Sequence, residues 1–88
     1  MSENQKKIWI TGASSGIGKA VAEKFAKEGW KVAASARRTA LLNELAKNQN
    51  IKSFPLDVTN RSQISDVFKN IINEFGDLDI CLFSSGTY

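Results

Sequence analysis

The sequence has no histidine and only one cysteine, Cys81, among its 88 residues. One cysteine cannot form a disulfide within the chain, and the usual cysteine and histidine ligands of a zinc site are missing. We therefore expect no metal site and no histidine base. Long apolar runs are absent too, since none approaches the roughly 20 residues that cross a membrane, and residues 1–7 lack the apolar segment of a signal peptide. We therefore expect a cytoplasmic protein with no membrane partner.

The remaining composition is ordinary for a globular protein, with 42% hydrophobic and 24% charged residues. A chain of this length is enough for one small domain, so we expect residues 1–88 to form a single unit. The formal net charge of +3 suits an anionic ligand. The lysines are scattered, however, and the only adjacent basic pair beyond residues 1–7 is Arg37-Arg38. We therefore expect no nucleic-acid partner.

Short apolar runs alternate with helical stripes along the whole chain. The runs predict strands at 8–10, 32–36, 51–56 and 78–83. The stripe of Ile17, Val21 and Phe25 predicts a first helix after the first strand. The helical pattern of the first helix starts at Gly16, and Gly29 is expected to terminate it. Thr39 is the expected N-cap of the second helix, and Thr59 and Gly76 are expected to begin and end the third. This alternation predicts a parallel sheet with right-handed crossovers.

A glycine-rich run, Thr11 to Gly18, lies between the first predicted strand and the first helix. Glycines permit the sharp turn that this junction needs, and they let a phosphate approach the main chain. The helix start adds unpaired N–H groups and the positive end of the dipole. Serine hydroxyls add donors around the phosphates or the adenosine ribose. The predicted pyrophosphate site consists of Gly12, Ser14, Ser15, Gly16, Ile17 and Gly18.

The run resembles the TGxxxGxG signature of the short-chain dehydrogenase/reductase family. The resemblance covers essentially the whole chain, including Asp57-Val58 and the segment from Gly76 to Ile80. It implies an α/β fold of the Rossmann type with strand order 3-2-1-4. It also implies adenine contacts at Asp57 and Val58, and a full-length oxidoreductase that transfers hydride between NAD(P) and an alcohol or carbonyl substrate. The alternative role for Asp57 is to help cap the helix near Thr59.

The end of the second predicted strand bears on the choice of cofactor. NAD enzymes place an acidic residue there, where it binds the ribose hydroxyls. Here that position is Ala36, followed by Arg37 and Arg38. A guanidinium binds a 2′-phosphate that a carboxylate would repel, and NADP-preferring family members often carry arginine at the position of Arg37. We therefore expect NADP(H) rather than NAD(H), although both arginines could also be solvated charges at the start of the second helix.

The chain departs from the family after the fourth predicted strand. The usual Asn-Asn-Ala-Gly is replaced by Phe83-Ser84-Ser85-Gly86. Gly86 still permits close approach to the cofactor, and the hydroxyls of Ser84 and Ser85 could face its ribose, but the first asparagine, which holds the central sheet in the family, is lost.

The resemblance places the catalytic serine and the Tyr-x-x-x-Lys pair further along a full-length chain. Tyr88 has no lysine four residues on, so we predict no catalytic residue here. Asp66, Asp77 and Asp79 are interpreted as structural or solvated.

We therefore expect this chain to be the N-terminal, cofactor-binding part of an oxidoreductase. The remaining strands and the oligomer interface would belong to the rest of the parent protein. Cys81, Leu82 and Phe83 would then lie on an exposed, apolar edge strand. Two alternatives remain open: a non-catalytic dinucleotide-binding or regulatory module, and, less favoured, a basic fragment that binds nucleic acid.

Overall fold

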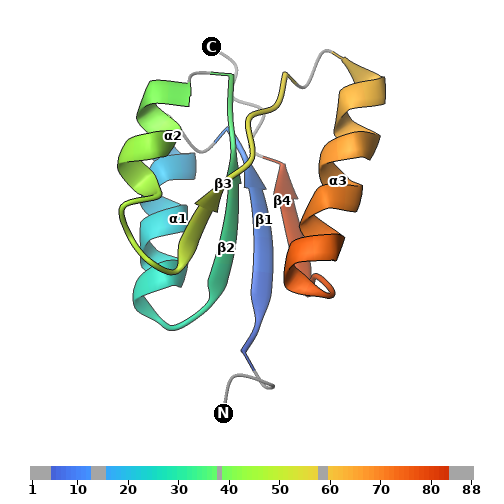
Figure 1. The fold of residues 1–88 in the computed structure, drawn as a ribbon. Coiled ribbons are helices and arrows are strands. Elements are labelled where there is room, and N and C mark those ends of the chain that lie inside the picture. The colour runs from blue at the N-terminus through green and yellow to red at the C-terminus, as the bar shows by residue number, and fades with distance from the viewer. Residues whose placement is uncertain (1–4, 13–15, 38, 58–59, 84–88) are drawn as a thin grey trace.

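The computed structural model describes residues 5–12, 16–37, 39–57 and 60–83. Four strands alternate with three helices, as Figure 1 shows. The elements are β1 (Lys7–Thr11), α1 (Gly16–Lys27), β2 (Lys31–Ser35), α2 (Thr39–Leu45), β3 (Ile51–Ser53), α3 (Arg61–Phe75) and β4 (Ile80–Phe83). All strand pairs are parallel and the sheet order is β3-β2-β1-β4. The predicted Rossmann-type topology is therefore confirmed.

The sheet separates two apolar layers, because successive side chains of a strand point to opposite faces. Ile8 and Ile10 of β1 lie on the face covered by α1 and α2, where they pack with Val32 and Ala34. Trp9 lies on the other face, in a second cluster that includes buried residues of α3. Figure 1 shows the same division, with α1 and α2 on one side of the sheet and α3 on the other.

Helix α1 approaches the sheet through its smallest residues. Gly18, Ala22 and Ala26, four residues apart, are buried. Val21 and Phe25, expected at the centre of the apolar stripe, are only partly buried and pack at the margin of the cluster. Because glycine and alanine have little or no side chain, the helix can lie close to the strands at this point.

Helix α3 begins one residue later than predicted. Its N-cap is Asn60 and not Thr59, because the Asn60 side chain accepts a hydrogen bond from the Gln63 N–H at 3.2 Å. The helix ends at Gly76, as predicted, where φ is 92° and the N–H donates to the Ile72 carbonyl at 2.8 Å. A positive φ of this size favours glycine. Similarly, Thr39 is the first residue of α2 and not the residue before it.

The two outer strands are shorter than predicted, although sheet-like hydrogen bonding continues past β3. Phe54 N donates to Ala34 O at 2.8 Å, and Leu56 N donates to Ala36 O at 3.1 Å. Pro55 stands between these two donors, at the position where a strand of this edge needs no N–H. The chain therefore stays alongside β2 as far as Leu56.

Near the amino ends of β1 and β4, two aspartates hold the beginning of β1. The Lys7 N–H donates to Asp79 Oδ2 at 2.8 Å, and the Asp79 N–H donates to the Lys7 carbonyl at 2.9 Å. The Lys7 ammonium also donates to Asp77 Oδ1 at 2.9 Å. Asp77 and Asp79 thus have the structural role that was predicted.

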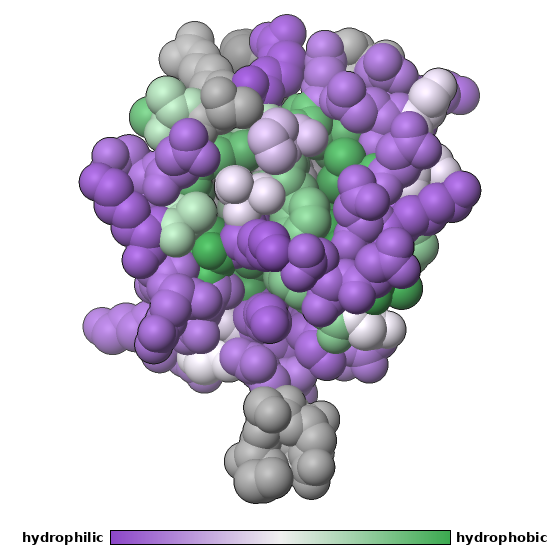
Figure 2. Space-filling model, viewed as in Figure 1, coloured by the Kyte–Doolittle hydropathy of each residue, from purple (hydrophilic) through white to green (hydrophobic). Residues whose placement is uncertain are grey.

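The outer surface is mostly polar. Figure 2 shows charged and polar residues around the rim of one face, with apolar residues visible in its middle. Within the described ranges, no helix combines the length and the apolar character needed to span a bilayer.

Candidate functional site

The carboxyl ends of all four strands lie at one edge of the sheet, because the strands are parallel (Figure 1). Thr11 pairs with both Ser35 and Phe83, so three strands end at the same level. The turns that follow β1, β2 and β3 therefore meet at this edge. Ligands of doubly wound sheets bind at such an edge.

Two described features after β1, the conformation of Gly12 and the start of α1, suit a phosphate site. Gly12 has φ 72°, a conformation that side-chain-bearing residues rarely adopt. Helix α1 begins at Gly16 and extends for 12 residues, with no acidic residue in its first turn and with Lys24 and Lys27 in its last. Its positive N-terminal end is therefore not neutralised by its own side chains.

The structure places the predicted pyrophosphate residues as follows. Gly12 is in the turn, Gly16 and Ile17 are the first residues of α1, and buried Gly18 is on the face that packs against the sheet. Ser14 and Ser15 lie outside the described residues.

A hollow of about 340 Å³ lies beyond the ends of β2 and β3, at the same edge of the sheet as this turn. Its lining residues come from three parts of the chain and are Arg37, Pro55, Leu56, Asp57 and Gln63. Arg37 is exposed, whereas Asp57 is half-buried. The structure thus brings together two of the predicted cofactor-binding residues that are 20 positions apart in the sequence. Arg38 and Val58 lie outside the described residues.

Main-chain hydrogen bonding explains why Arg37 and Asp57 share this hollow. Leu56 N donates to Ala36 O at 3.1 Å. Arg37 and Asp57 are the next residues on each side of that bond. The main-chain pairing of the two segments therefore sets the proximity of Arg37 and Asp57.

Helix α3 supplies the third side of the hollow. The Asp57 N–H donates to Gln63 Oε1 at 2.6 Å, and the Asp57 carbonyl accepts from Asn60 N–H at 2.9 Å. Sequence reasoning missed Gln63. The spacing Asn60-x-x-Gln63 is that of a capping box, in which the fourth side chain returns toward the helix start. With the cap assigned to Thr59, this signal was one residue out of register.

The third group of predicted residues, Ser84, Ser85 and Gly86, lies outside the described residues. The strand before it, β4, pairs only with β1 among the described strands. Cys81 is exposed, and Ile80 and Leu82 are 42% and 36% exposed. Partial burial raises the pKa of the Cys81 thiol above its ordinary value, so the thiolate is disfavoured at neutral pH. The expected apolar edge is present over Ile80, Cys81 and Leu82.

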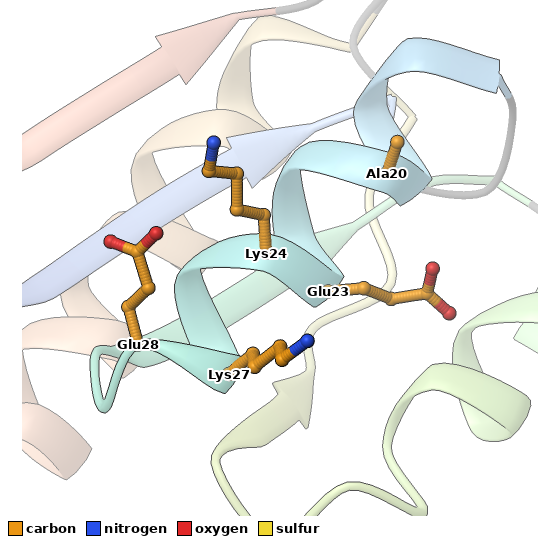
Figure 3. A pocket seen from close by; sticks show the side chains of 5 residues that line it. All are labelled: Ala20, Glu23, Lys24, Lys27 and Glu28. Atoms are coloured by element: carbon orange, nitrogen blue, oxygen red, sulfur yellow. The ribbon is translucent and has the colours of Figure 1, made fainter.

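A second surface hollow, of about 610 Å³, lies over the outer face of α1 (Figure 3). Ala20, Glu23, Lys24, Lys27 and Glu28 line it, all from one exposed stretch of chain. Figure 3 shows the charged side chains extending away from the helix, and their charges cancel. We assign no site to it. In the described part of the chain, no three acidic, cysteine or histidine side chains gather as metal ligands would.

The residues at the carboxyl edge of the sheet fit a phosphorylated dinucleotide. Gly12 and the start of α1 suit a pyrophosphate, and the hollow with Arg37 and Asp57 lies at the same edge of the sheet. A 3-2-1-4 parallel sheet with this turn after its first strand defines the Rossmann class of dinucleotide-binding folds. Within that class, the chain belongs to the short chain dehydrogenase family, whose model matches residues 6–87.

Related sequences and structures agree with this assignment. An uncharacterized oxidoreductase of Staphylococcus epidermidis is 40% identical over 84 residues, which are 93% of this chain and 36% of that protein. One from Staphylococcus haemolyticus is 42% identical over 80 residues, which are 88% of this chain and 35% of that protein. The chain thus spans about a third of the length of these relatives.

Two solved structures superpose closely on the fold. A short-chain dehydrogenase from Streptomyces avermitilis has a TM-score of 0.84 and 37% identity, and the match covers 92% of this chain and 30% of that one. The 3-ketoacyl-(acyl-carrier-protein) reductase from Brucella melitensis, complexed with NADH, has a TM-score of 0.82 and 29% identity. That match covers 86% of this chain and 32% of the reductase.

Proposed function

We propose that this chain is the NADP(H)-binding part of an oxidoreductase, with residues 1–88 forming the N-terminal portion of a single Rossmann domain. The parent enzyme would transfer hydride between NADP(H) and an alcohol or carbonyl substrate. The observation that carries the proposal is the joint placement of Arg37 and Asp57 in one hollow, at the edge of the sheet where the Gly12 turn also lies. The oxidoreductase relatives favour an enzyme over a regulatory module.

The cofactor preference follows from charge at the end of β2. Ala36 is 7% exposed and uncharged where an NAD enzyme would place a carboxylate. The exposed Arg37 follows it directly and lines the hollow. A 2′-phosphate there would gain a charge-assisted contact with the guanidinium and would meet no acid at position 36.

The nicotinamide would supply the hydride, and this chain's own residues would bind and orient the cofactor. The Gly12 turn and the start of α1 would hold the pyrophosphate. Arg37 would select the 2′-phosphate and Asp57 would accept a hydrogen bond from the adenine amino group. By the family resemblance, the residues that move the substrate proton belong to the rest of the parent protein.

Calorimetric titration with NADP(H) and NAD(H) tests this proposal, since the Brucella reductase makes NAD(H) the competing cofactor. We expect tighter binding of NADP(H). Arg37→Ala should weaken NADP(H) binding about 10- to 100-fold, the worth of a charge-assisted hydrogen bond, and should change NAD(H) binding by less than about threefold. Lys27→Ala, which removes the same charge at the far end of α1, is the matched control. Equal affinity for both cofactors, unchanged by Arg37→Ala, would remove the NADP(H) assignment.

A further inference from the structure

We propose that Gln63 is a positioning residue for the adenosine end of this site, acting through the main chain of Asp57. The inference rests on the proposed function, and it adds a residue that the glycine run, Arg37 and Asp57 do not account for. Gln63 is half-buried, comes from α3 and lines the hollow.

The N–H and the carbonyl of Asp57 are both hydrogen-bonded to the start of α3. Its N–H donates to Gln63 Oε1 at 2.6 Å, and its carbonyl accepts from Asn60 N–H at 2.9 Å. Asn60 Oδ1 in turn accepts from Gln63 N–H at 3.2 Å. These three bonds close a ring of contacts from Asp57 to Gln63. The helix cap and the segment that presents the Asp57 side chain are therefore one unit.

The strand side is equally constrained. Leu56 is 2% exposed and its N–H is bonded to Ala36 at 3.1 Å. The chain therefore leaves the side of β2 at a fixed point, and the N–H of the next residue, Asp57, donates to Gln63. Removing that bond takes away one of the contacts that hold the peptide carrying the carboxylate, while the sheet hydrogen bond of Leu56 remains.

A neutral amide also suits this position better than a carboxylate. The Gln63 Oε1 accepts from the Asp57 N–H, and the remaining Nε2 group can only donate hydrogen bonds. Gln63 lines the same hollow as Arg37 and Asp57. A glutamate would keep the acceptor but would add a second negative charge beside Asp57. Gln63 thus positions Asp57 without repelling an anionic ligand.

The test uses NMR titrations of the chain with 2′,5′-ADP and with adenosine, which carries no charge. Gln63→Ala should weaken both ligands about 3- to 10-fold, the effect of one hydrogen bond. Gln63→Glu keeps the acceptor, so adenosine binding should stay within about twofold of wild type while 2′,5′-ADP binding falls at neutral pH. That deficit should narrow as the pH is lowered through about 4, because the new carboxyl takes up a proton near the ordinary glutamate pKa.

Ser62→Ala is the matched control, since Ser62 is exposed in the same first turn of α3 and lies outside the ring of contacts. It should leave both affinities within about twofold. If Gln63→Ala lowers the melting temperature and changes neither affinity, Gln63 is only structural and the inference is overturned. If Gln63→Ala does not fold, Gln63→Glu decides: equal loss of both ligands at all pH values overturns the inference.

Failure of the proposed function can be distinguished from failure of this inference. Wild-type chain that binds adenosine as tightly as 2′,5′-ADP contradicts NADP(H) selection, yet the Gln63 effect on adenosine stands. Wild-type chain that binds neither ligand overturns both.

Discussion

At the residue scale, a buried polar contact in the core joins Trp9 to Ser35. The indole N–H of Trp9 donates to Ser35 Oγ at 2.8 Å, and the two residues are 2% and 0% exposed. Ser35→Ala keeps the volume but removes the acceptor from a site that water does not reach. We expect a loss of about 1–3 kcal/mol in the free energy of unfolding, measured by urea titration with circular dichroism. Ser62→Ala, an exposed serine in α3, is the control and should change stability by less than about 0.5 kcal/mol. Equal effects would show that the bond contributes nothing.

Residue identity also sets how far the site can be predicted from sequence. Gly12 and Arg37 are recognisable because their chemistry is local: a positive φ needs glycine, and a guanidinium after an uncharged strand end favours an anion. Gln63 is not recognisable in the same way. Its importance arises from a contact with Asp57 across a loop, and that contact depends on where α3 begins.

At the element scale, β3 is joined to α3 by one ion pair. Lys52 Nζ lies 2.8 Å from Glu74 Oε1, and both side chains are about half exposed. The hydrogen bond and charge of Lys52 hold the pKa of the Glu74 carboxyl below its ordinary value. A carboxyl whose pKa is lowered by folding stabilises the fold above its unfolded-state pKa, and this contribution is lost as the pH falls through the folded-state pKa.

Glu74→Gln should therefore reduce stability slightly at pH 7, and its difference from wild type should vanish as the pH is lowered below about 4. The effect should be small and should shrink in high salt, because the pair is exposed. Urea titrations at several pH values measure it. In a double-mutant cycle, Glu74→Gln should cause no further loss of stability in a chain that already carries Lys52→Gln. A pH-independent effect of Glu74→Gln would contradict the role of the pair.

The elements themselves were predictable wherever hydrophobic periodicity was strong. The buried stripe of Val67, Ile71 and Phe75 in α3 follows helical spacing. Phe68 belongs to the same apolar pattern but is 42% exposed, with its ring centroid 6.1 Å from that of Trp9. Periodicity alone does not reveal which side of a stripe meets the sheet. Element ends were less predictable, because Thr59 and Asn60 are both good capping residues and only one of them is used.

At the scale of the whole molecule, helices lie on both faces of the sheet, and no described strand pairs with the outer side of β4. Among the described strands β4 pairs only with β1, and Ile80 and Leu82 are exposed on it. An apolar edge with unpaired main-chain groups is a template for pairing with another strand. The 88-residue chain alone should therefore self-associate as its concentration rises.

Leu82→Lys should reduce this association, because a charge on an edge strand opposes the pairing of two copies. Sedimentation velocity over about a hundredfold range of concentration measures it. Leu41→Lys is the matched control: Leu41 is 41% exposed, close to the 36% of Leu82, but it lies in α2 and away from any strand edge. Equal effects of the two substitutions would attribute association to general surface hydrophobicity. A selective effect of Leu82→Lys would identify the β4 edge as the surface through which two copies of this chain associate.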